Sequence, residues 1–247
     1  TEPYIMLNAD KLRSAIAESG NIVFFGGAGV STESGIPDFR SNNGIYDAIR
    51  GFGYSPEILL SHDFFINNTE VFYRYYKLTL AKTGFKPNAA HNALAKLEAL
   101  GKLSSVITQN VDGLHQMAGS KCVYELHGSI YRNYCMKCHR FYDIRHIHSS
   151  DGVPLCECGG IVKPDVVLYG EQLDWSVVDE AVKSIMDADM MIVGGTSLSV
   201  YPAASLVDYY QGDRLFLINK SSTPYDGRAD AIINGSIGEI MQSVIRA

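Results

Sequence analysis

Long apolar runs, an excess of basic residues and internal repeats are all missing from this chain of 247 residues. No segment approaches the roughly 20 apolar residues that a membrane-spanning helix needs, so we expect no membrane partner. Lysine and arginine number 21 against 27 aspartates and glutamates, and the net charge of −6 argues against direct nucleic-acid binding. The N-terminal residues lack the basic start and long apolar stretch of a signal peptide, and we expect a cytoplasmic protein.

Cysteine is scarce outside one region of the chain. The five cysteines are an odd number, which together with a cytoplasmic location argues against a disulfide framework. Four of them form a Cys-x2-Cys pair and, seventeen residues later, a Cys-x-Cys pair, a spacing typical of a zinc ribbon: Cys135, Cys138, Cys156 and Cys158. Four thiolates leave no open coordination position, so we predict one structural zinc ion per chain. Cys122 lies outside this cluster and is expected to be a buried apolar thiol.

The most informative segment follows the apolar residues 22–25, which predict a buried parallel strand. Gly27 and Gly29 then allow a tight turn and a close approach of backbone N–H groups to a phosphate. The third glycine of the dinucleotide-binding fingerprint is missing, because Thr32 occupies its place. Residues 35–40 add an acid, an aromatic ring and a guanidinium beside the loop, for which a hydride-transfer enzyme has no evident need. The sequence therefore disfavours a conventional dehydrogenase.

This glycine segment, with residues 35–40, resembles the first signature of the sirtuins, which are NAD-dependent protein lysine deacylases. The later signatures of that family follow in the same order at residues 108–112, 127–128, 163–167 and 195–197. The resemblance spans Gly27 to Asn219, nearly the whole chain. It implies a bacterial-type deacetylase that transfers the acetyl group of acetyl-lysine to ADP-ribose, releasing nicotinamide and O-acetyl-ADP-ribose. It further implies NAD as co-substrate, acetylated lysine in extended protein segments as the partner, and a monomer.

The resemblance also assigns roles to individual residues. It makes His127 the general base, a task that suits a group with a pKa near neutrality, and it makes Asn110 and Asp112 the residues that hold nicotinamide and ribose. Helix capping is the alternative role for Asn110 and Asp112, and it can coexist with ligand contact. His91 and His115 are the rival histidines, and their positions fit structural roles better. The implied NAD contacts, of which the last two rest on alignment alone, are Gly27, Ala28, Gly29, Ser31, Asp38, Phe39, Arg40, Gln109, Asn110, Asp112, Gly195, Thr196, Ser197, Asn219, Ile237 and Gly238.

Residues 166–171 look like the substrate strand of the family. An exposed strand edge there would accept an extended peptide by adding a strand. Phe39, Val167 and Tyr169 are expected to line the acyl-lysine site, although ordinary core packing is an equal alternative for Val167. Family members that prefer succinyl or malonyl groups carry a Tyr-x-x-Arg pair, and here Tyr76 stands in the place of the arginine. We therefore predict a preference for acetyl over succinyl groups, with the nearby Arg74 as the residue that could compensate.

Strands and helices alternate along most of the chain. Apolar segments predict strands at 22–25, 103–108, 123–125, 190–193 and 215–218, and helical patterns occur at 10–19, 88–100, 177–188 and 203–210. This alternation predicts an α/β fold, a Rossmann-like doubly wound parallel sheet, with a smaller zinc-ribbon and helical domain inserted. We assign residues 1–40, 77–130 and 164–247 to the NAD-binding domain, and residues 41–76 and 131–163 to the small domain.

Two other functions use some of the same features. An NAD hydrolase or ADP-ribosyltransferase would use the same pocket without an acyl acceptor. A non-catalytic zinc-ribbon module would bind nucleotide without releasing nicotinamide. The substrate strand and Phe39 favour the deacetylase over the NAD hydrolase or ADP-ribosyltransferase, and release of nicotinamide would distinguish it from the zinc-ribbon module.

Overall fold

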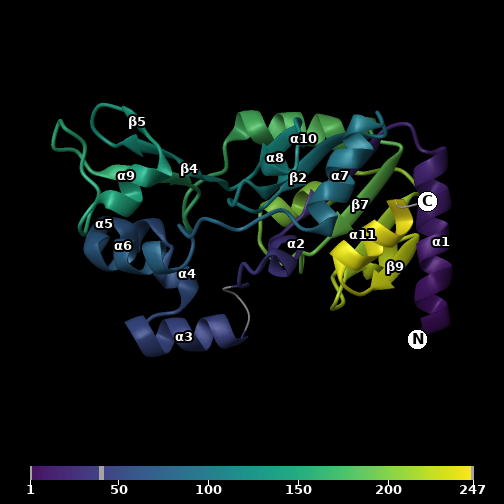
Figure 1. Ribbon diagram of the computed structural model, residues 1–247, viewed down its shortest axis with the longest axis horizontal. Coiled ribbons are helices and arrows are strands. Elements are labelled where there is room, and N and C mark those ends of the chain that lie inside the picture. Colours follow the sequence, from purple (N-terminus) through teal and green to yellow (C-terminus); the bar gives the residue numbers. More distant parts are fainter. Residues whose placement is uncertain (1, 39–41, 246–247) are drawn as a thin grey trace.

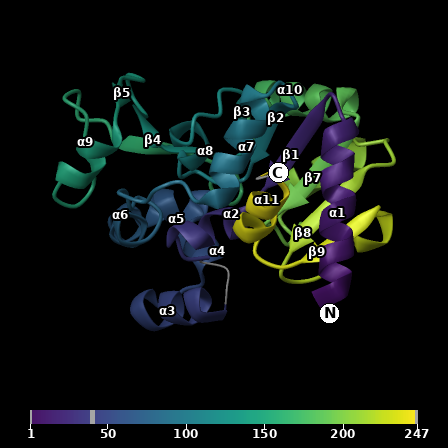
Figure 2. The same ribbon diagram turned by 45° about the vertical axis from the view of Figure 1, so that its right-hand side comes forward.

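The structure, a computed structural model, describes residues 2–38 and 42–245. Two lobes lie side by side along the longest axis, and the views in Figures 1 and 2 agree on this arrangement. The larger lobe contains a parallel sheet, and the smaller lobe contains an antiparallel sheet with a group of helices. None of the helices in this described part is both long enough and apolar enough to cross a membrane.

The sheet of the larger lobe has six parallel strands in the order β3-β2-β1-β7-β8-β9. Their bounds are β1 (Ile22–Gly26), β2 (Leu103–Thr108), β3 (Val123–Glu125), β7 (Met190–Gly194), β8 (Leu215–Asn219) and β9 (Ala231–Asn234). Every residue of β1, β7 and β8 is buried, as expected of strands covered on both faces. This order confirms the predicted Rossmann-like fold. The strand order reverses between β1 and β7, which places the topological switch point, where such sheets bind ligands, beyond these two strands.

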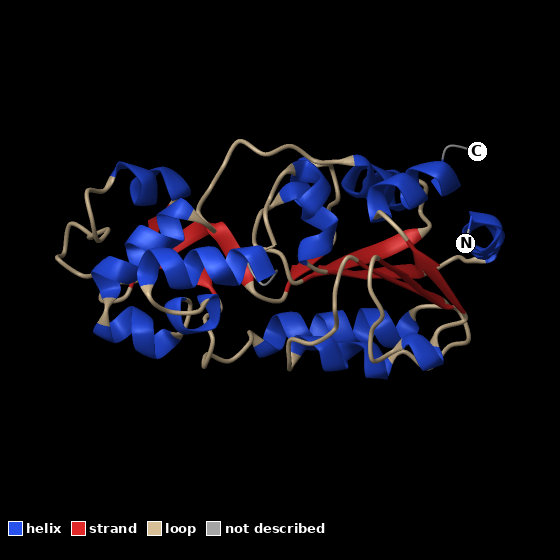
Figure 3. Ribbon diagram, turned by 90° about the horizontal axis from the view of Figure 1, so that it is seen from below, coloured by secondary structure: helices blue, strands red, loops and turns tan. Residues whose placement is uncertain are grey.

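Helices cover both faces of this sheet (Figure 3). Alternate residues of β1 face opposite ways, so Phe24 packs in one core cluster and Phe25 in the other. The Phe24 face is covered by α1 (Glu2–Glu18), α7 (Ala89–Ala99) and α11 (Ile237–Ile245). The Phe25 face is covered by α10 (Trp175–Asp187) and the 3₁₀ helix η2 (Ala203–Tyr209). Short turns complete the lobe: α2 (Ala28–Ser31), η1 (Thr32–Ser34), α8 (Leu114–Met117) and η3 (Asp226–Arg228).

The predicted elements agree with the observed ones at most boundaries. Helix α7 begins after Asn88, whose side-chain oxygen accepts a hydrogen bond from Ala90 N at 2.9 Å, and His91 Nδ1 accepts one from Asn88 N at 3.2 Å. This reciprocal cap explains why the helix starts where the sequence predicts. Helix α1 starts at Glu2 rather than near residue 10, and residues 203–209 form a 3₁₀ rather than an α-helix. Strand β9 and helix α11 were not predicted.

The smaller lobe combines segments from two parts of the sequence. Its antiparallel sheet has the order β5-β4-β6, with bounds β4 (Gly128–Cys135), β5 (Phe141–Tyr142) and β6 (Val162–Val166). Helix α9 (Ile144–Ser149) lies between β5 and β6 in the sequence. Its other helices are α3 (Asn42–Phe52), α4 (Pro56–Leu59), α5 (His62–Asn67) and α6 (Thr69–Leu78). One core cluster joins both parts, because the aromatic residues Phe65 and Phe72 pack with Ile130 and Val162. The division of the chain into two domains stays a prediction.

Candidate active site and metal centre

Two adjoining pockets lie at the carboxyl ends of the parallel strands, and the first of them also reaches the smaller lobe. The first, with a volume of about 250 Å³, is lined by residues of both lobes, among them Ser31, Leu60, Asn110, His127 and Tyr169. The second, about 560 Å³, is lined only by residues of the larger lobe, from the loops after β1, β7, β8 and β9. Ala28 and Asp38 line both pockets, so one elongated ligand could occupy the two together.

The floor of the second pocket is a contact between two glycine loops. Gly29 N donates to Gly195 O at 2.7 Å, and a Cβ atom on Gly29 would lie 2.8 Å from Gly195 Cα. Gly195 has a φ of +61°, and a Cβ there would lie 2.4 Å from Val30 N. Only glycine permits this backbone contact. The sequence predicted both glycines as cofactor contacts, and the structure brings their loops together at the switch point.

Asn219 and Thr196 form the side of this pocket. The Asn219 Oδ1 atom accepts a hydrogen bond from Thr196 N at 2.9 Å. The Asn219 Nδ2 atom is buried and has no hydrogen-bond partner in the described part of the chain. Buried polar groups are normally paired, so this amide fits a bound ligand that offers an acceptor oxygen, such as the ribose of a nucleotide. The residues present therefore fit NAD at this position.

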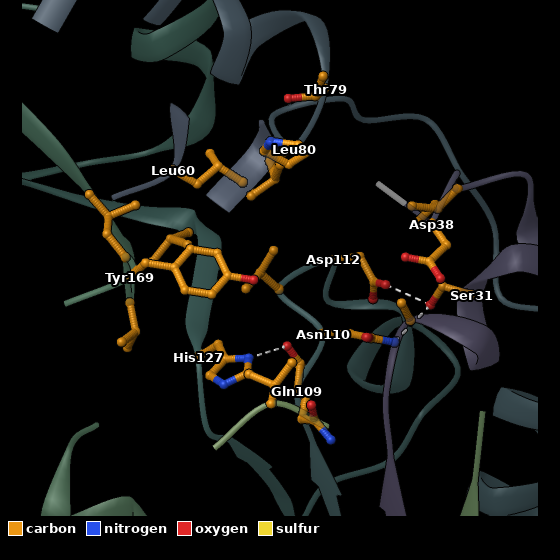
Figure 4. Close-up of a pocket in the computed structure, with 18 of the residues that line it drawn as sticks. Ser31, Asp38, Leu60, Thr79, Leu80, Gln109, Asn110, Asp112, His127 and Tyr169 are labelled. Carbon is orange, nitrogen blue, oxygen red and sulfur yellow. Dashed lines mark hydrogen bonds between the residues drawn. The ribbon is translucent and has the colours of Figure 1, made fainter. Parts of the chain in front are cut away.

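Ser31, Asn110 and Asp112 form a hydrogen-bonded group in the wall of the first pocket (Figure 4). Ser31 Oγ donates to Asp112 Oδ2 at 2.6 Å, and Asn110 Nδ2 donates to Ser31 Oγ at 3.1 Å and to Gly27 O at 2.9 Å. The other Asp112 oxygen accepts a hydrogen bond at 2.9 Å from the N–H of Leu114, the first residue of α8. Asp112 therefore contacts the start of α8 and Ser31 at once, and the sequence allows both roles together.

His127 lies between β3 and β4, on the floor of the first pocket (Figure 4). Its Nδ1 atom lies 2.9 Å from the backbone oxygen of Gln109. A carbonyl oxygen only accepts hydrogen bonds, so Nδ1 carries the proton of the neutral ring and Nε2 is the nitrogen that can take up a further proton. The Gln109 side chain donates to Thr196 Oγ1 at 3.1 Å, which links this histidine to the cofactor loops.

The rival histidines lie away from both pockets. His91 and His115 are buried beside each other, with ring centroids 4.7 Å apart, and neither lines a pocket wall. Burial lowers the pKa of His91 to about 4, with the charge of Asp112 opposing that shift. Burial and the neighbouring His91 lower the pKa of His115 to about 3. Both rings are neutral near pH 7 and occupy structural positions.

The predicted substrate segment forms a wall of the first pocket, but its edge is partly paired within the chain. Val167 N donates to His127 O at 3.0 Å. Tyr169 N donates to Leu60 O at 3.0 Å, and His62 N donates to Tyr169 O at 2.9 Å. Figure 4 shows the Tyr169 ring facing the pocket, between Leu60 and His127. Residues 60–62 thus already occupy one edge of a segment that the sequence predicted to be open.

The structure does not place the Tyr73–Tyr76 segment in the pocket. Both rings are buried in the core of the smaller lobe, and Tyr73 donates to Val162 O. Arg74 lies over the ring of Phe52, 5.8 Å from its centroid. The side chains that line this part of the pocket come from the following loop, which the sequence analysis missed: Thr79, Leu80, Lys82 and Phe85. These residues lie in the loop between α6 and α7 and match no sequence motif. Their position before Asn88, the cap of α7, was therefore the one feature of the sequence that could have pointed to them.

The remaining predicted contacts divide into three groups. Ser197 and Ile237 line the second pocket, as does Thr196. Gly238 does not line it, because its N–H donates to Glu33 Oε1 at 2.9 Å, and a Cβ there would lie 2.3 Å from Glu33 Oε2. Phe39 and Arg40 lie outside the described residues.

The four clustered cysteines lie at the tip of the smaller lobe. Their Sγ atoms all lie within 4.8 Å of one another, and the Cys135–Cys158 and Cys138–Cys156 pairs are each 3.5 Å apart. A tetrahedral zinc ion with Zn–S bonds of about 2.3 Å sets its sulfurs about 3.8 Å apart, so the cluster fits this ion. A Cβ on Gly160 would lie 2.7 Å from Cys135 Sγ, so a side chain at this position would crowd the cluster. Cys122 lies apart from the cluster and is half-buried rather than buried.

Comparisons with known proteins agree with this geometry. A family model described as the Sir2 family matches residues 27–202. Proteins named NAD-dependent protein deacetylase are similar over nearly the whole chain: that of Clostridium perfringens is 59% identical, covering 96% of this chain and 98% of its own, and that of Clostridium acetobutylicum is 57% identical, covering 97% and 100%. A mutant Sir2 homologue bound to ADP-ribose superposes with a TM-score of 0.87 at 39% identity, covering 96% and 95% of the two chains. A Sir2 structure described with a p53 peptide and NAD+ gives 0.82 at 39% identity, covering 95% of each chain.

Proposed function

This chain belongs to the Sir2 family, and we propose that it is an NAD-dependent protein lysine deacetylase. It transfers the acetyl group of acetyl-lysine to ADP-ribose, and it releases nicotinamide and O-acetyl-ADP-ribose. One observation carries the proposal: His127, with Nε2 as the nitrogen that can accept a proton, lines the same pocket as the Ser31–Asn110–Asp112 group and the substrate-wall residues. This single cavity unites a base, polar groups for a ribose and an apolar wall for an acyl chain.

Bound NAD supplies an electrophilic ribose carbon with nicotinamide as its leaving group. His127 accepts the proton of a ribose hydroxyl at Nε2, because its Nδ1–H is held by the Gln109 carbonyl at 2.9 Å. The same carbonyl stabilises the protonated ring, since Nδ1 remains a donor throughout. The backbone hydrogen bond thus fixes both the orientation and the tautomer of the base.

Asn110 and Asp112 orient the nicotinamide and ribose end of the cofactor. Asp112 holds the Ser31 hydroxyl at 2.6 Å, and Asn110 bridges that hydroxyl and the Gly27 carbonyl. The two side chains therefore tie the end of β2 to the loop after β1. Holding these groups in advance lowers the entropic cost of reaching the reactive arrangement.

Val167 and Tyr169 provide the wall against which the acyl-lysine chain lies. Leu60, Leu80 and Val111 add apolar surface to the same pocket. A neutral acetyl-lysine loses little hydration in such a site, whereas a charged lysine would be costly to bury. This difference explains how the pocket would favour the modified side chain over the free one.

The direct test is to incubate the purified protein with NAD and an acetyl-lysine peptide and to analyse the products by mass spectrometry. We expect deacetylated peptide, nicotinamide and O-acetyl-ADP-ribose in equal amounts. Free ADP-ribose formed at the same rate without peptide would instead indicate an NAD hydrolase. No release of nicotinamide under any condition would indicate a non-catalytic nucleotide-binding module.

Two properties of the whole protein belong to the same proposal. We infer that it is a monomer, because the pockets are lined by residues of one chain. We also infer that it acts in the cytoplasm, as the sequence predicts. Size-exclusion chromatography with light scattering checks the oligomeric state, and fractionation of the source cells checks the location.

A further inference from the structure

Glu171 is itself a lining residue of the first pocket, and its carboxylate connects three segments of the chain there. Its Oε2 atom accepts from Leu168 N at 2.9 Å and from Lys163 Nζ at 3.1 Å. Its Oε1 atom lies 2.8 Å from His62 Nδ1. Glu171 and Lys163 are about one-fifth exposed, so these contacts are partly shielded from solvent. Burial raises the pKa of Glu171, but the bonds from Leu168, His62 and Lys163 outweigh burial and lower it overall.

Each of these donors belongs to a different part of the pocket surroundings. Lys163 lies on β6 and also donates to the backbone oxygens of Pro164 and Val166, at 3.3 and 3.2 Å. His62 is the first residue of α5, and Leu168 lies within the pocket wall itself. The Glu171 carboxylate therefore joins the start of the wall, the turn that ends it and the adjacent helical segment.

The backbone of the wall is paired with that same helical segment. Tyr169 exchanges two hydrogen bonds with residues on either side of Ser61, at 3.0 and 2.9 Å, in a parallel bridge. A two-residue bridge is a weak structure on its own, because isolated strand pairs are marginally stable in water. The His62–Glu171 contact lies immediately beside this bridge and connects the same two segments through side chains.

We propose that Glu171 is a positioning residue for the acyl-peptide substrate: its carboxylate locks residues 60–62 onto residues 167–171, so that the wall carrying Val167 and Tyr169 is formed before the peptide binds. This role rests on the proposed deacetylase function. Without the Glu171 contacts, the wall would become ordered only when the peptide binds. The entropic cost of that ordering would weaken substrate binding. The hydrogen-bond partners of the Glu171 carboxylate include neither His127 nor any residue of the second pocket. We therefore expect its loss to leave NAD binding and the chemical step unaffected.

Other charged and phenolic groups near the wall do not replace this carboxylate. Tyr75 lies close enough to Glu57 and Tyr169 that, after burial, their charges contribute to raising its pKa to about 12. The Tyr75 phenol is therefore neutral under ordinary assay conditions and cannot form an ion pair with Lys163. Glu171 is thus the carboxylate that holds Lys163 and His62 in the described residues.

The test compares Glu171→Gln with the wild type in steady-state kinetics and in direct binding. We expect KM for the acetyl-lysine peptide to rise about tenfold, equal to about 1.4 kcal/mol, with kcat changed less than threefold. The affinity for ADP-ribose, measured by calorimetry, should stay within twofold. Glu70→Gln is the matched control, because Glu70 is an exposed carboxylate on α6 that lines neither pocket and makes no ion pair in the described residues.

A second pair of variants separates positioning from general structure. His62→Gln keeps an N–H donor for Glu171, whereas His62→Ala removes it, so the glutamine variant should lie closer to the wild type in peptide KM. Equal peptide KM in the wild type, Glu171→Gln and His62→Ala would overturn the proposal. So would a parallel loss of ADP-ribose affinity and kcat, which would show a general loosening of the fold.

Binding of a fluorescent acetyl-lysine peptide in the presence of ADP-ribose, followed by anisotropy, does not depend on turnover. A wild type that binds this peptide but forms no product would contradict the proposed function alone. A peptide Kd that Glu171→Gln leaves unchanged would contradict the positioning role alone.

Discussion

At the scale of single residues, His127 shows how one backbone carbonyl selects the reactive nitrogen of a side chain. We expect His127→Ala to lower deacetylation by about 10²–10⁴-fold, the usual contribution of a general base, because no other histidine lines either pocket in the described residues. The fold and ADP-ribose binding should persist, since His127 lines the first pocket and not the second, which is formed by the cofactor loops. Product formation by mass spectrometry and calorimetry with ADP-ribose measure the two effects. Turnover near the wild-type rate would remove His127 from this role.

Gly29 is a residue whose missing side chain determines the site. A methyl group there would lie 2.8 Å from both Gly195 Cα and Gly195 O, which are backbone atoms that cannot rotate away. We expect Gly29→Ala to push the two cofactor loops apart and to weaken ADP-ribose binding at least about tenfold, equal to about 1.4 kcal/mol.

Gly51→Ala is the control for Gly29→Ala, because it also replaces a helical glycine with alanine but meets nothing within 4 Å. It should bind ADP-ribose normally and should be slightly more stable, by about 0.5–1 kcal/mol. Similar ADP-ribose affinities for both variants would show that the loops move apart easily.

The acyl preference also depends on individual side chains, though not on the one that the sequence indicated. Tyr76 is buried in the smaller lobe, so the absence of an arginine there does not decide which acyl group fits. The pocket lining is mostly apolar, and its one described cation is Lys82. An unpaired succinyl carboxylate would be costly to bury there. We therefore still expect acetyl to be preferred over succinyl by at least about tenfold in kcat/KM, or about 1.4 kcal/mol.

Matched acetyl and succinyl peptides at saturating NAD measure this preference. If succinyl removal equals or exceeds acetyl removal, the prediction is wrong. A specific loss of the succinyl activity in Lys82→Met would then identify Lys82 as the partner of the carboxylate.

At the scale of secondary-structure elements, the His91–His115 contact joins α7 to α8 behind the site. Residues at the start of both helices hold the cofactor loop: Asn88, the cap of α7, donates to Val30 O at 2.7 Å, and Asp112, which accepts from Leu114 N of α8, also accepts from Ser31 at 2.6 Å. The two histidines have pKa values lowered to about 4 and about 3, whereas an unfolded histidine titrates near 6.5. The unfolded chain therefore binds these protons first as the pH falls.

The stability that the neutral pair provides is complete above about pH 6.5 and is lost progressively as the pH falls toward the folded pKa values. At pH 5 the loss is about 2 kcal/mol for each histidine, from 1.36 kcal/mol per pH unit. Urea unfolding of the wild type and of His115→Phe at pH 7.5 and pH 5 measures it. The variant should lose about 2 kcal/mol less than the wild type between the two pH values. Equal losses would show that His115 titrates normally.

The same scale shows what the sequence could predict. The strands β1, β2, β7 and β8 were predicted to within one residue, because fully buried parallel strands are continuous apolar runs that end in glycine or polar residues. Asn88 marked the start of α7 through its cap chemistry. Strand β9 was missed because it is short and has an exposed terminal residue, and the pocket loop at 79–85 was missed because tertiary packing alone brings it to the site. Tyr76 was wrongly used as a guide to the acyl site for the same reason. A motif match gives a position in the sequence, but the packing of α6 decides whether that side chain points into the pocket or into the core.

At the scale of the whole molecule, the two lobes have separate cores and share one pocket. The sheet lobe is held by two apolar clusters, one on each face, and the smaller lobe by a third cluster that includes Cys135 and Cys156. The second pocket is lined by the sheet lobe alone, whereas the first needs both lobes. Nucleotide binding should therefore depend on the larger lobe, and catalysis on the correct packing of the two.

Zinc provides the means to test this division. The chain should contain one zinc ion, and less than half an equivalent in carefully purified protein would count against the site.

In Cys156→Ala the binding energy of the metal is lost from the smaller lobe, where it is part of the folding energy. Heating should then give an early transition for that lobe and a later one for the sheet lobe, and ADP-ribose at 100 times its Kd should stabilise the later one by about 2.7 kcal/mol. Cys122→Ala, outside the metal cluster, should unfold as the wild type does. Deacetylation should fall in Cys156→Ala while ADP-ribose binding persists, because the acyl pocket needs residues of both lobes and the second pocket does not. A single transition in Cys156→Ala, with both activities lost together, would mean that the lobes fold as one cooperative unit.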